Sequence, residues 1–113
     1  MAQFQVRKGQ TLFQDGEDSV EVFYLQRCVE DTWVDVLELH LEIGRSWGDQ
    51  IDLLYRNKAN PDELLVHVSG FGYWGDAEYY QSEDGGFNWT ANIQRRKVNP
   101  DLYTSENLLQ DYQ

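Results

Sequence analysis

Apolar and polar residues alternate strictly over residues 37–43. The apolar positions are Leu37, Leu39, Leu41 and Ile43, and the polar positions between them are Glu38, His40 and Glu42. A period of two is typical of a β-strand with one buried face. Residues 19–29 are rich in β-branched and aromatic side chains and predict a second strand, with turn-forming residues at 30–32 between the two.

The acidic residues of this region also allow a helical alternative. Asp31, Asp35, Glu38 and Glu42 lie at spacings of four, three and four, with Gly44 placed as a C-terminal cap. The β-branched residues among positions 32–43 favour the strand instead. The apolar phase shifts by one position between residues 36 and 37, which indicates a β-bulge or a strand that serves two environments.

Further short strands are expected on both sides of two turns. Residues 51–55 and 64–68 flank a turn that contains Pro61, and residues 77–81 and 89–93 flank a glycine-containing turn. Residues 104–111 could form a short C-terminal helix. About six to eight short strands in hairpin succession predict an all-β or mainly β fold, an antiparallel meander that closes as a small barrel or folds into a sandwich. At 113 residues, the chain is expected to form a single acidic β-rich domain over residues 1–113.

Charge is the strongest feature of the composition. The chain has 20 acidic and 9 basic residues, which gives a formal net charge of −11. Nine of the acidic residues lie within residues 15–42, where Arg27 is the only basic residue. Such a surface repels phosphates, whose neutralisation by Lys and Arg supplies most non-specific nucleic-acid affinity. We therefore expect no direct nucleic-acid binding and a protein partner that has a basic surface.

Residues 82–89 read Ser-Glu-Asp-Gly-Gly-Phe-Asn-Trp. They fit the pattern Ser/Thr-x-Asp-x-Gly-x-x-Trp/Phe and so resemble the Asp-box of sialidases and related β-propellers. The resemblance covers eight of 113 residues. It implies a hairpin in which Ser82 and Asp84 bond the turn backbone, Gly86 takes a conformation closed to other residues and Trp89 packs beneath. A propeller of at least four blades exceeds this length, so the motif is interpreted as a structural turn without sialidase activity.

Aromatic residues gather just before that motif, in a glycine-containing segment. Phe71, Tyr73, Trp74 and Tyr80 are the candidate anchors. Flat rings of this kind can fill a partner's pockets, stack on sugars or form the core of a small sheet. The sequence leaves these three roles open.

Catalytic and metal-binding chemistry is weakly represented. Glu38, His40 and Glu42 would share one face of a strand, and His67 could approach them to complete a metal site, but a solvated polar face explains the same pattern more simply. We find no nucleophile elbow, phosphate loop or paired cysteines, and expect no enzyme activity, metal or cofactor. No apolar stretch is long enough to span a membrane and residues 1–7 lack a signal-peptide core, so a cytoplasmic location, in a cell or a host, is expected.

The sequence therefore predicts a non-catalytic acidic binding protein that acts by stoichiometric protein–protein interaction. Its expected target is a basic, nucleic-acid-handling protein, as for an inhibitor, an immunity protein or a phage anti-defence protein. The expected binding face comprises Asp31, Asp35, Glu38 and Glu42. The alternative is a module that binds carbohydrate or another small ligand through the aromatic segment.

Overall fold

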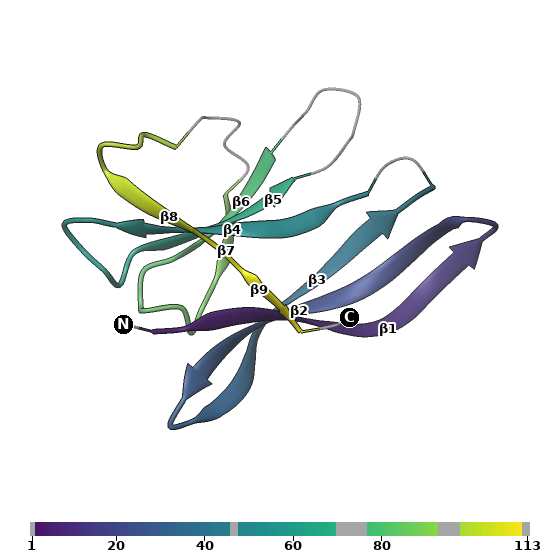
Figure 1. Cartoon of the computed structure of the whole chain (residues 1–113), viewed down its shortest axis with the longest axis horizontal. Helices are drawn as coiled ribbons and strands as arrows, with labels where there is room; N and C mark the ends of the chain where they lie inside the picture. The colour runs from purple at the N-terminus through teal and green to yellow at the C-terminus, as the bar shows by residue number, and fades with distance from the viewer. Residues whose placement is uncertain (1, 46–47, 70–76, 93–97, 112–113) are drawn as a thin grey trace.

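The computed structural model describes residues 2–45, 48–69, 77–92 and 98–111. Within these residues the chain is all-β, with nine strands in two sheets and no helix (Figure 1). The strands are β1 (Phe4–Asp15), β2 (Asp18–Val29), β3 (Thr32–Ile43), β4 (Gln50–Asn57), β5 (Leu64–Ser69), β6 (Ala77–Ser82), β7 (Thr90–Asn92), β8 (Tyr103–Asn107) and β9 (Leu109–Asp111). The predicted all-β class is thus confirmed.

The two sheets pack in a sandwich-like arrangement and do not close into a barrel. One sheet has four strands in the order β3-β2-β1-β9, and the other has five in the order β7-β6-β5-β4-β8. Adjacent strands are antiparallel except for β1 and β9, which pair in parallel. In Figure 1 the yellow C-terminal segment passes from β8 in one sheet to β9 in the other.

The predicted C-terminal helix is wrong, because residues of that segment pair as strands in both sheets. Residues 103–107 pair with β4, and residues 109–111 pair with β1. Leu108, between them, is buried in the core. Backbone pairing on both sides of a buried leucine outweighs the local helix-start signal at Thr104 and Ser105.

The helical alternative for residues 31–43 is also wrong, because β3 pairs with β2 along its whole length. Leu25 lies opposite Leu37, whereas Gln26 lies opposite Asp35, so Val36 is an extra residue on β3. This bulge stands at the position where the apolar phase shifts. It puts Leu37 and Leu39 on the core face while residue 35 points to the outer face.

The core lies between the sheets and is built from alternating positions of the central strands. Its members are Phe4, Val6, Phe23, Leu25, Leu39, Leu41, Ile51, Leu54, Leu64, Val66, Val68 and Leu108. The alternation leaves Tyr24, Gln26, Glu38, His40 and Glu42 on the outer face of the four-stranded sheet.

Three strands of the four-stranded sheet are longer than those of the five-stranded sheet, so their ends are not packed against it. These three strands have 12 residues each, about 40 Å, while the longest strand of the other sheet has 8, about 26 Å. The longer strands therefore overhang. The β1–β2 turn extends away from the five-stranded sheet, and the β2–β3 turn extends at the opposite end (Figure 1). Residues 11–18 and residues 30–35 are all exposed.

Candidate functional site

The acidic segment identified in the sequence is one structural unit. Residues 15–42 comprise the β1–β2 turn followed by the β2–β3 hairpin at the edge of the four-stranded sheet. Arg27, its one basic residue, points to the core side. Arg27 Nε donates to the carbonyl oxygen of Gly85 at 3.0 Å, and the guanidinium lies 4.2 Å from the centre of the Phe87 ring. The outer face of this hairpin therefore carries carboxylates without a cation of its own.

Three of the four predicted acidic site residues share that outer face. Asp35, Glu38 and Glu42 alternate with buried leucines along β3 and are exposed. Asp31 lies apart from them, at the tip of the β2–β3 turn. The turn residues Glu30 and Asp31 have φ of 48° and 65°, the left-handed conformation that a tight two-residue hairpin requires.

Asp35 is held by hydrogen bonds within the protein. Arg7 Nη2 donates to Asp35 Oδ2 at 3.1 Å, and Gln26 Nε2 donates to Asp35 Oδ1 at 2.8 Å. Gln26 Oε1 in turn accepts from Gln5 Nε2 at 2.7 Å. Asp35 thus belongs to a polar network across three strands, which reduces the negative charge that it presents to a partner.

Glu38 also has neighbours within the protein. His40 Nε2 lies 3.2 Å from Glu38 Oε2. The pKa of Tyr24 is raised, mainly by a hydrogen bond to the Glu38 carboxylate and to a lesser extent by desolvation of the Tyr24 hydroxyl. The Arg7 guanidinium lies 4.3 Å from the centre of the Tyr24 ring. Glu42, at the far end of the same face, lies opposite Val20.

The Asp-box segment forms the turn between β6 and β7 and bonds mainly to itself. Ser82 is 1% exposed, and its Oγ accepts from Gly86 N at 2.9 Å. Asp84 Oδ1 accepts from Ser82 Oγ at 2.7 Å and from the backbone N–H groups of Phe87 and Asn88 at 3.1 and 3.0 Å. Asn88 Nδ2 also donates to Asp84 Oδ2 at 2.7 Å. The hydrogen bonds from the backbone and side chain of Asn88, followed by the bond from Ser82, hold the pKa of Asp84 well below its ordinary value of 3.8.

Gly86 and Trp89 attach this turn to the rest of the protein. Trp89 Nε1 donates to the carbonyl oxygen of Gly86 at 2.8 Å, and the Trp89 ring meets Phe4 edge-on at 6.2 Å. Gly86 has φ of 98°, and the space where a Cβ would stand is occupied by the Phe4 ring. The turn therefore packs on a side chain of the opposite sheet, so the geometry gives these residues a structural role.

The depressed pKa of Asp84 predicts a pH-dependent contribution to stability. The ionised carboxylate favours the folded state above about pH 4, and this contribution is lost as the pH falls through the lower pKa of the folded state. Asp84→Asn should therefore have a lower urea midpoint than the wild type at pH 7. Below about pH 4, the difference between the two midpoints should shrink as the pH falls. Urea titrations of the wild type and of Asp84→Asn from pH 7 to pH 2.5 measure the difference between their midpoints. The other carboxylates contribute equally to both proteins, so their effects cancel in this difference. A constant difference would contradict the assignment.

Comparison with protein-family models, with curated proteins and with solved structures finds no match for this chain. Its function is therefore inferred from the placement of its own residues. No helix able to cross a membrane occurs in the described part of the chain.

Only one of the four predicted aromatic anchors, Tyr80, lies within the described residues. Phe71, Tyr73 and Trp74 lie outside the described residues. Tyr80 is half-buried and packs against the core between the sheets. Strand alternation turns the Tyr80 ring inward and places Tyr79, which is 7% exposed, on the other face, where its ring packs against His67. The anchor role of Tyr80 stays a prediction.

The two histidines do not converge on a metal site. His40 lies on the outer face of the four-stranded sheet and His67 on the outer face of the other sheet, since it alternates with buried Val66 and Val68. His67 Nδ1 lies 2.8 Å from Asp52 Oδ1, and Ser69 Oγ donates to Asp52 Oδ2 at 3.2 Å. The Ser69 hydroxyl therefore bonds to the Asp52 carboxylate rather than to the His67 ring. No group of three metal-ligating side chains occurs among the described residues.

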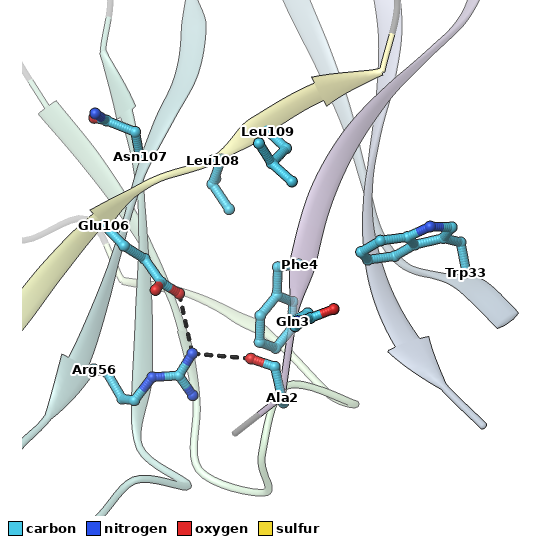
Figure 2. Close-up of a pocket in the computed structure, with 9 residues that line it drawn as sticks. All are labelled: Ala2, Gln3, Phe4, Trp33, Arg56, Glu106, Asn107, Leu108 and Leu109. Atoms are coloured by element: carbon cyan, nitrogen blue, oxygen red, sulfur yellow. Dashed lines mark hydrogen bonds and ion pairs between the residues drawn. The ribbon is translucent and has the colours of Figure 1, made fainter. Parts of the chain in front are cut away.

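A groove of about 420 Å³ opens where the start of β1 separates from the β8–β9 segment (Figure 2). The Arg56 side chain is 9% exposed. Its Nη2 donates hydrogen bonds to the carbonyl oxygen of Ala2 and to Glu106 Oε1, both at 3.0 Å. Trp33 and Arg56 lie on opposite sides of β1 in this view. Alternation within single strands does not predict this groove, because its walls come from five separate strands.

Proposed function

We propose that this protein is a non-catalytic acidic binding protein that acts by stoichiometric interaction with a partner bearing a basic surface. One observation carries the proposal. The nine carboxylates of residues 15–42 lie on the β1–β2 turn and the β2–β3 hairpin that follows it, and the one arginine of that segment is directed toward the other sheet. Complementary potentials of this kind steer association and select partners.

Proteins that handle nucleic acids present the basic surfaces that this hairpin would fit. Such surfaces hold phosphates through Lys and Arg, and carboxylates on a rigid strand can occupy the same positions. Residues on one face of a strand repeat about every 6.6 Å, so the edge hairpin displays its charges at fixed spacing. Binding there would shield or inhibit the partner, as immunity and phage anti-defence proteins do.

Charge reversal on β3 tests this proposal. Glu38→Lys combined with Glu42→Lys should weaken binding to a basic partner at least about tenfold at low salt, and less at high salt because ions screen the remaining attraction. Surface plasmon resonance at 50 and 300 mM salt, against a panel of purified basic nucleases and polymerases, measures the change.

The matched control reverses two exposed carboxylates of the other sheet and its loops. Glu83→Lys combined with Asp101→Lys changes the net charge equally and should bind the partner nearly as the wild type does. Equal weakening by both variants would show that only overall charge matters. If the wild-type protein binds no member of the panel at 50 mM salt, the proposed function is wrong.

A second candidate function is the binding of a carbohydrate or another small ligand. The groove of Figure 2 favours it, because a volume of about 420 Å³ lies within the range of small-molecule sites and Trp33 and Leu109 expose apolar surface at its rim. Isothermal titration calorimetry with a panel of mono- and oligosaccharides, repeated with Trp33→Ala, distinguishes this function from the first. Sugar binding should be insensitive to salt.

A further inference from the structure

The end of the β1–β2 hairpin exposes two apolar side chains next to each other. Leu12 is 48% exposed and Phe13 is 58% exposed, in a stretch where residues 11–18 are all exposed. Phe13 is the most exposed aromatic residue in the described part of the chain. Exposed aromatic rings on a protruding element are typical anchors of protein interfaces.

Strand register places Phe13 on the same face as the acidic residues of β3. Phe13 lies opposite Val20 on β2, and Val20 lies opposite Glu42 on β3. The three residues form one row across the outer face of the sheet. The predicted acidic surface is therefore continuous with an exposed aromatic ring at its Glu42 end, a connection made by pairing and not by sequence proximity.

Acidic residues surround this end of the hairpin. Asp15, Glu17 and Asp18 lie at its turn, and all three are exposed. Arg45 Nε bonds Glu17 Oε2 at 3.1 Å, while Lys8 Nζ is directed to Glu21 at 2.9 Å. Asp15 lies opposite Asp18 in the strand pairing, so two like charges stand together at the tip. An opposing basic surface would relieve their repulsion.

We propose that the tip of the β1–β2 hairpin, residues 11–18, is the element that docks into the partner, with Phe13 as its anchor. This inference rests on the proposed function and names the surface that performs it. Phe13 enters an apolar pocket of the partner, and the surrounding carboxylates meet Lys and Arg residues at the rim of that pocket. The overhang of the long strands makes this possible, because it carries the tip clear of the five-stranded sheet.

A second copy of the same chain is a less suitable occupant of this surface. Pairing two tips would bring the carboxylates at residues 15, 17 and 18 of both copies together, in a protein that already has a net charge of −11. The strand edge is also irregular, since the β1–β2 register shifts between Lys8 and Thr11 and again between Thr11 and Phe13. Such bulges oppose edge-to-edge pairing of β1 with another strand.

The experiment compares two apolar side chains of similar exposure, 58% for Phe13 and 54% for Leu102. Phe13→Ser removes the proposed anchor, and Leu102→Ser removes a residue that is 54% exposed in the loop before β8, remote from the hairpin in Figure 1. Both variants are tested by surface plasmon resonance against the same panel of basic nucleases and polymerases, with urea midpoints to verify folding. Phe13→Ser should weaken binding at least about tenfold, and Leu102→Ser should leave it unchanged.

The possible results separate this inference from the proposed function. If the wild-type protein binds a panel member and Phe13→Ser binds equally well, the tip is not the docking element, although the proposed function stands. If the wild type binds no member, the proposed function fails. Sedimentation velocity covers the remaining case: a wild-type dimer that Phe13→Ser converts to a monomer would identify a second copy as the occupant and overturn the inference.

Discussion

Phe4→Ala is expected to lower the free energy of unfolding by about 3–5 kcal/mol, as is typical for removal of a buried aromatic ring. Phe4 is 5% exposed and belongs to the core between the sheets. Its ring also lies beneath Gly86 and meets Trp89 edge-on, so its removal leaves a cavity under the Asp-box turn. Equilibrium urea unfolding, followed by tryptophan fluorescence and by circular dichroism, measures the loss.

Phe87→Ala is the matched control for Phe4→Ala. Phe87 belongs to the same turn but is 47% exposed, and the Arg27 guanidinium lies 4.2 Å from the centre of its ring. Its removal should cost about 1 kcal/mol or less. If the two variants lose similar stability, the assignment of Phe4 as the link between the turn and the opposite sheet is wrong.

Gly86→Ala is expected to cost about 2–4 kcal/mol, from backbone strain and steric overlap together. Gly86 has φ of 98°, and a Cβ there would stand 2.5 Å from Phe4 Cζ and 3.3 Å from Leu64 Cδ1. The Phe4 ring is held in the core and has little room to withdraw. Urea midpoints again provide the measurement.

Gly16→Ala separates the two causes. Gly16 also has a positive φ, 63°, but nothing lies within 4 Å of the position of its Cβ. Gly16→Ala should therefore show the strain alone, about 1 kcal/mol. Combining Gly86→Ala with Phe4→Leu tests the overlap directly, since the loss should then be less than the sum of the two single losses. Strict additivity would show that the Phe4 ring does not oppose the alanine.

The four-stranded sheet illustrates how far the sequence pattern reaches. The alternation at residues 37–43 predicted a strand with one buried face. The phase shift between Val36 and Leu37 predicted either a bulge or a strand that serves two environments, and the strand pairing shows a bulge. Both predictions follow from local rules, because a period of two fixes which side chains share a face. The acidic character of residues 15–42 was likewise visible in the sequence, since charge depends on composition.

The arrangement of these elements in space was not available from the same rules. Residues 104–111 carry a local helix-start signal, yet they pair with β4 and β1, strands more than 45 residues away along the chain. The sequence left the role of Tyr80 open between core packing and recognition, whereas strand register places its side chain against the core. His40 and His67 could have met at one site, but they lie on the outer faces of different sheets.

The sequence alone determined the all-β class, the two strands around the turn at residues 30–32, and the concentration of carboxylates within residues 15–42. These properties arise from side-chain periodicity, propensity and charge, which act over a few residues. Only the tertiary structure decided that Arg27 is directed to the other sheet, that Asp35 is bound by Arg7, and that Phe13 joins the row of Val20 and Glu42. Each of these depends on pairing between distant strands and on the unequal lengths of the two sheets, which no local pattern contains.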